Sequence, residues 1–197
     1  MQQLLKCYTY IESYKSNNGY FIITFKGDLT EIGAYAFSGC DRLESVILPN
    51  GLTTIGEGVF EGCSALKKFK GKFASEDGRA LIVDKVLKSF APAGLTEYTI
   101  PDIVTTIGDS AFSDCTSLTS ITISDSVTTI GCDAFAYCRS LTSVYCKATT
   151  PPAGSSDMFY GNASGRKIYV PMESVEAYRS AEGWCNYANS IVGYDFE

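Results

Sequence analysis

A nine-residue pattern of apolar, glycine and aromatic positions recurs four times along the chain. Each copy begins with Ile-Gly, has Phe at its sixth position and ends with Cys at its ninth. The first two copies start 23 residues apart, as do the last two, and the middle interval of 52 residues leaves room for one longer repeat of 29. Self-similarity of this period is typical of solenoids. The copies are residues 32–40, 55–63, 107–115 and 130–138.

A short run of alternating apolar and polar residues follows each copy. Leu stands three residues after each Cys, and it starts short runs with β-branched residues, as in residues 43–49 and 118–123. Such alternation predicts a β-strand. One strand per 23 residues cannot bury a core alone, so we expect stacked coils with one parallel ladder sheet. The expected ladder strands are 20–26, 43–49, 66–71, 95–101, 118–124, 141–147 and 168–170.

The longer repeat departs from this pattern. Its two short apolar runs, 78–83 and 86–90, flank the dipeptide Asp84-Lys85. Two such runs around two residues predict a β-hairpin, here an insertion within about residues 72–94 that replaces the Ile-Gly…Cys segment of its coil.

The two ends of the repeat region, which we place at 20–170, are expected to be capped. Residues 149–165 are rich in Pro, Gly and Ser and predict an excursion loop. A helical cap is expected over 171–197, because Pro171 can open a helix and Gly183 can close it. We expect Met172, Val175 and Tyr178 on its buried face, and residues 1–19 as the cap of the other end.

The composition excludes several classes of function. The chain has 197 residues, a net charge of −6 and no histidine, with 45% hydrophobic and 19% charged residues. These values indicate a globular protein of one or two domains. The acidic balance argues against nucleic-acid binding. The sequence contains no run of about 18 apolar residues, so no membrane span is predicted. Without histidine, Ser-His-Asp and Cys-His catalysis are excluded.

The cysteines favour a structural role. Cys40, Cys63, Cys115 and Cys138 share one repeat position, which predicts a buried ladder of free thiols. With no Cys-x-x-Cys pair and no histidine, no metal site is expected, and no catalytic or cofactor-binding residue is indicated. Cys132 falls at a partly exposed position with no local cation or base to activate it. An enzyme that uses Cys132 or a carboxylate is the weaker alternative.

Two stretches, "LESVILPNGLTTIGEGVFEGCSAL" and "LTSITISDSVTTIGCDAFAYCRSLTSV", resemble the BspA-like leucine-rich repeat family. The resemblance covers about residues 20–150, and the tail "KIYVPMESVEAYRSAEGWCNYANSIVG" is similar to the C-terminal cap of such surface proteins from Bacteroides-type bacteria. It implies a curved, right-handed, leucine-rich-repeat-like coil of the α/β type.

For function, the resemblance implies a non-enzymatic cell-surface or secreted protein whose export signal is absent from this sequence. Its implied role is adhesion to a protein or glycan partner on host or other cells, and we expect a monomer. The residues alone fit a cytosolic protein equally well. A structural spacer that extends another domain from the surface is a further alternative.

Two patterns supply candidate partner-binding residues. Between Lys67 and Lys88 lie seven of the 16 basic residues and three acids, a local charge of +4. This stretch is either a patch for an acidic partner or polysaccharide, or a solvated face. The second pattern is the outward positions of the ladder strands. The candidates are Lys68, Lys70, Lys72, Lys85, Lys88, Ile47, Thr99, Thr122 and Tyr145.

Overall fold

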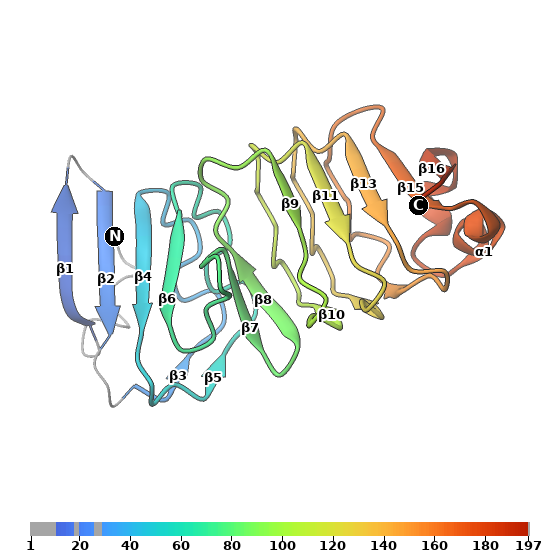
Figure 1. Ribbon diagram of the computed structural model, residues 1–197. Coiled ribbons are helices and arrows are strands. Elements are labelled where there is room, and N and C mark those ends of the chain that lie inside the picture. Colours follow the sequence, from blue (N-terminus) through green and yellow to red (C-terminus); the bar gives the residue numbers. More distant parts are fainter. Residues whose placement is uncertain (1–10, 18–19, 26–28, 197) are drawn as a thin grey trace. The chain divides into compact units, whose positions relative to one another are not determined.

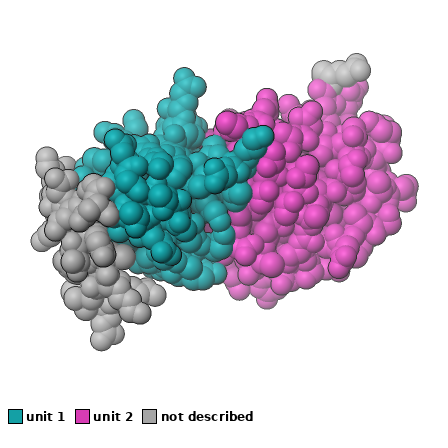
Figure 2. Space-filling view, turned by 90° about the horizontal axis from the view of Figure 1, so that it is seen from below, with its two compact units in different colours: residues 1–94 teal, residues 95–197 magenta. Residues whose placement is uncertain are grey.

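The chain forms stacked β-coils in two compact units, residues 1–94 and 95–197 (Figure 2). The computed structural model describes residues 11–17, 20–25 and 29–196. The expected solenoid with parallel ladder strands is confirmed, although the α/β label is loose. The ladder strands form one sheet in each unit and not the single sheet that was expected. In the described part of the chain, the single α-helix has six residues.

The ladder sheet of unit 1 has the strand order β1–β2–β4–β6 (Figure 1). Strands β2 (Tyr20–Phe25), β4 (Leu43–Leu48) and β6 (Lys68–Gly71) are parallel. Strand β1 (Ile11–Asn17) runs antiparallel to β2. It therefore pairs with the edge of β2 that would otherwise be open to another chain.

The ladder sheet of unit 2 is parallel throughout (Figure 1). Its last strand was not expected from the sequence, whereas each of the seven predicted ladder strands is present in one unit or the other. In spatial order, its strands are β9 (Glu97–Thr99), β11 (Ser120–Ile123), β13 (Ser143–Cys146), β15 (Lys167–Pro171) and β16 (Ile191–Tyr194).

The short corner strands between coils also pair. In unit 1, β3 (Glu31–Ile32) lies parallel to β5 (Thr54–Ile55). In unit 2, β10 (Thr106–Ile107), β12 (Thr129–Ile130) and β14 (Ala153–Gly154) do the same. The isoleucines of the four repeat copies, Ile32, Ile55, Ile107 and Ile130, are buried, so the corner residue that these copies keep constant serves the core.

The nine-residue segments form arcs that stack ring on ring. Phe37 and Phe60 are parallel, with ring centroids 5.4 Å apart, and in unit 2 the centroids of Phe112 and Phe135 are 4.9 Å apart. Backbone hydrogen bonds also join neighbouring arcs; the N–H of Phe37, for example, donates to the carbonyl of Val59. Each arc is therefore held by its own ladder of hydrogen bonds and aromatic contacts.

Two positions of every arc have left-handed backbone. The eighth residue has φ of +72° at Gly39, +67° at Gly62, +59° at Asp114 and +57° at Tyr137. The fourth residue is also left-handed in all four arcs. Residues other than glycine adopt this conformation at a cost of about 1–2 kcal/mol, so the left-handed backbone favours the glycines at the eighth position of the first two copies, Gly39 and Gly62.

Gly39→Ala is expected to lower the free energy of unfolding by about 1 kcal/mol. A methyl group at Gly39 would meet no atom within 4 Å, so the loss of stability would come from the backbone conformation alone. Urea unfolding measures it. Gly33→Ala is the matched control, because Gly33 has equally open surroundings and no positive φ. Equal effects of the two substitutions would contradict the backbone explanation.

The divergent repeat contains a hairpin of β7 (Ala80–Val83) and β8 (Val86–Phe90). Its two turn residues, Asp84 and Lys85, both have positive φ, as a type I′ turn requires. The Arg79 guanidinium donates hydrogen bonds to the carbonyls of Ala91 and Ala93 at 3.1 and 2.8 Å, which fixes the chain as it leaves the hairpin.

Residues 149–165 are a further coil and not the expected excursion loop. Strand β14 continues the corner sheet, and Phe159 stacks on Phe135 with centroids 5.3 Å apart. Asn162 takes the place of the arc cysteine: its side-chain amide donates to the carbonyl of Phe135 at 2.7 Å, as the thiol of Cys138 donates to that of Phe112. One inserted residue and the missing Ile and Cys hid this copy of the repeat.

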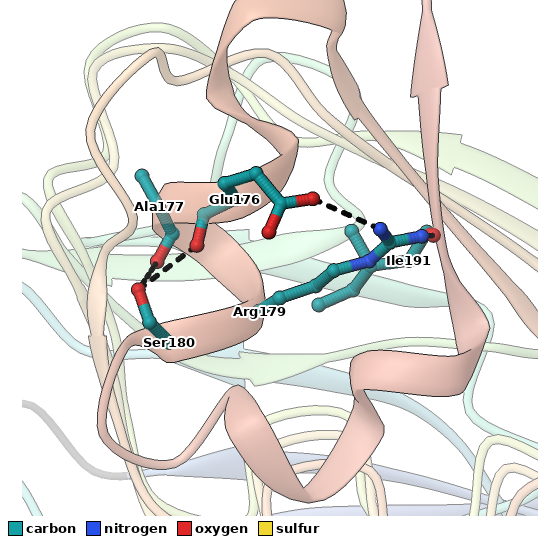
Figure 3. Close-up of polar contacts among 5 residues, drawn as sticks. All are labelled: Glu176, Ala177, Arg179, Ser180 and Ile191. Atoms are coloured by element: carbon teal, nitrogen blue, oxygen red, sulfur yellow. Dashed lines mark hydrogen bonds and ion pairs between the residues drawn. The ribbon is translucent and has the colours of Figure 1, made fainter.

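The C-terminal segment packs η3 (Met172–Ser174), α1 (Val175–Ser180) and η4 (Cys185–Ser190) around buried aromatic residues. Tyr178 is buried as expected, but Met172 is 67% exposed, which corrects its predicted place on the buried face. The predicted single helix is broken into short turns, so its regular helical spacing does not hold at Met172. Arg179 joins α1 to β16 by a hydrogen bond to the carbonyl of Ile191 (Figure 3).

Trp184 occupies the centre of this C-terminal segment. The side chain is fully buried, and its indole N–H donates to the carbonyl of Pro152 at 2.7 Å. Its ring meets those of Tyr178 and Phe159 edge to face, at 4.8 and 5.9 Å. The segment is therefore bound to the last coil by an aromatic contact and a buried hydrogen bond.

Candidate functional site

The outer face of unit 1 presents in-register rows of side chains. Val46 and Leu48 are buried, and the residues between and before them point outward. Thr24, Ile47 and Lys70 form one row, and Ile22, Ser45 and Lys68 form the next. Lys68 and Lys70 are exposed, whereas Ile47 is half-buried. Two candidate lysines therefore lie side by side on one face of β6.

Of the other basic candidates, two contact neighbouring side chains and one is exposed. Lys88 forms an ion pair with Glu57, and the ammonium of Lys72 lies 4.9 Å from the ring centroid of Phe73. Lys85 is exposed in the hairpin turn. Lys67, outside the candidate set, pairs with Glu44 at 2.5 Å. Thus the structure leaves Lys68, Lys70 and Lys85 most accessible to a partner.

The outer face of unit 2 carries aromatic side chains. Thr99, Thr122, Tyr145 and Tyr169 follow one another in register across four strands. The rings of Tyr145 and Tyr169 stack with centroids 4.7 Å apart, and Tyr194 lies edge to face with both. The candidates Thr99, Thr122 and Tyr145 thus share one row in unit 2, whereas the lysine candidates belong to unit 1.

Sequence reasoning missed Tyr169 and Tyr194. A signal for Tyr169 existed, because residues 168–170 were expected as a ladder strand and aligning it with 144–146 sets Tyr169 beside Tyr145. Tyr194 could not be found this way, since β16 follows no copy of the repeat pattern.

The thiol ladder is present but incomplete. Cys63, Cys115 and Cys138 are buried, while Cys40, in the first copy of the motif, is half-exposed, which corrects its predicted burial. The thiols of Cys63 and Cys138 donate to the carbonyls of Phe37 and Phe112 at 3.2 and 3.0 Å. No copy of the motif precedes Cys40 in the sequence, so its surroundings differ. Burial raises the pKa of the Cys63 and Cys115 thiols.

Native thiol labelling followed by peptide mass spectrometry is expected to modify Cys132 and Cys185 first, because both are exposed. Cys63, Cys115, Cys138 and Cys146 should stay unlabelled until the protein unfolds. Burial raises the pKa of Cys146 to about 11, which keeps its thiol protonated at neutral pH. Labelling of these four at the rate of Cys132 would contradict their burial. Cys7 lies outside the described residues.

The described residues contain no group of three or more His, Cys, Asp or Glu side chains placed to hold a metal ion. Cys132 has a backbone N–H bonded to the Asp109 carboxylate at 2.8 Å. Within the same residues, no helix has the length and apolar character needed to cross a bilayer.

Comparison with known proteins identifies the repeats. The model of the BspA type leucine rich repeat region matches six copies, over residues 7–75 and 87–187. The chain belongs to this family of leucine-rich repeat proteins, as its sequence resemblance implied. None of the curated proteins compared with the chain matches it significantly.

A solved structure shows the same fold. A leucine rich cell surface protein from Faecalibacterium prausnitzii A2-165 is 22% identical with a TM-score of 0.59; the match covers 86% of this chain and 52% of that one. A leucine-rich repeat protein from Eubacterium ventriosum ATCC 27560 is 24% identical with a TM-score of 0.49, covering 78% and 52% of the two chains. The chain thus spans about half the length of either.

Proposed function

We propose that this chain is a non-enzymatic interaction module of a bacterial cell-surface or secreted protein, which mediates adhesion through the outer faces of its ladder sheets. Leucine-rich repeats commonly serve protein interaction or surface display. The observation that carries the proposal is the in-register exposure of side chains on one face of each sheet. The partner is a protein or glycan on host or other cells.

Lys68 and Lys70 are the first candidates for contact in unit 1. They lie on neighbouring outward positions of β6, and the described residues form no ion pair with either one. Two adjacent ammonium groups on a flat sheet face suit an acidic partner. The basic hairpin turn at Lys85 belongs to the same unit.

The double substitution Lys68→Glu and Lys70→Glu is expected to weaken partner binding about tenfold or more and to flatten its salt dependence. The measurement is capture of matrix proteins and glycans by the immobilised protein at several salt concentrations. Arg42→Glu with Arg139→Glu is the matched control, since both arginines are exposed and lie outside the ladder strands. Equal weakening by the control pair would refute a contact at β6; binding of no matrix protein or glycan would refute the function.

A structural spacer is the alternative favoured by a different observation. Outward positions such as Ser45, Ser120, Thr122 and Ser143 are short and polar, and binding hot spots usually need Tyr, Trp or Arg. A chain that extends another domain without binding anything would show no partner in the same capture experiment.

A further inference from the structure

Three tyrosines from separate strands gather on the outer face of unit 2, and we call Tyr145, Tyr169 and Tyr194 the tyrosine cluster. Tyr145 and Tyr169 are half-buried, and Tyr194 is 41% exposed. Tyr194 also contacts Phe196, with ring centroids 4.9 Å apart. On the same sheet face, the neighbouring strands carry Thr99 and Thr122 in register with Tyr145. The aromatic side chains are thus confined to the last three strands.

The ring geometry decides which part of the cluster is available. Tyr145 and Tyr169 are within 13° of parallel at 4.7 Å, so each covers a face of the other. Tyr194 meets them at 71° and 67°, edge to face. Ring edges carry partial positive charge, and tyrosine hydroxyls both donate and accept hydrogen bonds. The cluster therefore suits oxygen-rich groups better than a sugar ring, which needs an open aromatic face.

Two lysines flank the cluster along the strands. Lys167 is two residues before Tyr169, in register with Ser143, and Lys147 is two residues after Tyr145. Both are exposed. Alternation along β15 directs Lys167 to the same face as the tyrosines, and Lys147, one residue after the end of β13, continues the alternation between the buried Cys146 and Ala148. The described residues form no ion pair with either lysine. Asp195, next to Tyr194, is the acid nearest to the cluster in sequence.

We propose that the tyrosine cluster with Lys147 and Lys167 binds an acidic peptide segment of a partner protein. Carboxylates of the peptide pair with the two ammonium groups, while its backbone carbonyls and apolar side chains contact the tyrosine hydroxyls and rings. Tyrosines of restricted rotamer supply contact area at low entropic cost, as in antibody binding sites. The proposal rests on the interaction function above and names the partner chemistry for unit 2.

The test is selection of peptides from a random display library on the immobilised full chain. The expected result is enrichment of peptides rich in Asp and Glu. Tyr145→Thr with Tyr169→Thr should weaken their binding at least tenfold. Threonine occupies the same row at Thr99 and Thr122, so this variant is compatible with the sheet. Lys147→Gln with Lys167→Gln should weaken binding and reduce its dependence on salt.

Several results would overturn the proposal. These are selection of no peptide, enriched peptides without an excess of acids, or equal binding by the threonine variant when circular dichroism shows that it is folded. Polygalacturonate that binds more tightly than every selected peptide, and is lost in the threonine variant, would make an acidic glycan the occupant. If a matrix partner still depends on Lys68 and Lys70 in the capture experiment, the proposed function stands without this inference.

Discussion

Phe60→Ala is expected to lower the free energy of unfolding by about 3–5 kcal/mol. The ring is buried between Phe37 and Phe69, with centroid distances of 5.4 and 5.3 Å. Its removal loses contacts with the coils on both sides and leaves a cavity that stacked coils cannot close without moving their backbone hydrogen bonds. Urea unfolding followed by circular dichroism measures the loss.

Cys63→Ala is the comparison within the same arc. The Cys63 thiol is smaller than the phenyl ring and donates one hydrogen bond to the carbonyl of Phe37. Its loss should cost about 1–2 kcal/mol. If Cys63→Ala proves as costly as Phe60→Ala, the thiol ladder and not the phenylalanine ladder is the main support of the arcs.

Trp184→Ala is expected to destabilise unit 2 by about 3–5 kcal/mol. The substitution removes the largest buried side chain of the C-terminal segment together with its contacts to Tyr178 and Phe159. It also leaves the carbonyl of Pro152 without its indole donor. Differential scanning calorimetry measures the change in stability.

Trp184→Phe separates the two contributions. Phenylalanine keeps most of the apolar contact but loses the 2.7 Å hydrogen bond, which should cost about 1–3 kcal/mol. A melting temperature of Trp184→Ala equal to that of the unsubstituted protein would show that the segment from η3 to β16 does not depend on this side chain.

The repeat pattern predicted the coils because each repeat carries two local signals, one for its strand and one for its corner. Alternation locates a strand, as in residues 118–123, and the constant Ile-Gly corner locates the next turn. Residues 149–165 were misassigned because their coil keeps Phe159 but replaces the corner isoleucine by Gly154 and the cysteine by Asn162. Its place in the stack comes from contacts with Phe135, which composition does not reveal.

The candidate surface could be predicted only in part. Alternation identified Lys68, Lys70 and Tyr145 as outward residues, because each strand face follows from the buried positions beside it. It could not assemble the tyrosine cluster, since Tyr194 comes from a strand outside the repeat pattern. Nor could it identify the ion pair that occupies Lys88, because Glu57 is 31 residues away and reaches it only after the coils stack.

The single tryptophan allows fluorescence to distinguish the two units. Trp184 lies in unit 2, and unit 1 has no tryptophan. Its fluorescence therefore reports unfolding of unit 2, while circular dichroism reports strands of both units. Coincident denaturation curves from the two probes would indicate one cooperative transition, and separated curves would give each unit its own stability. The unsubstituted chain thus carries a built-in reporter of how far cooperativity extends along a solenoid.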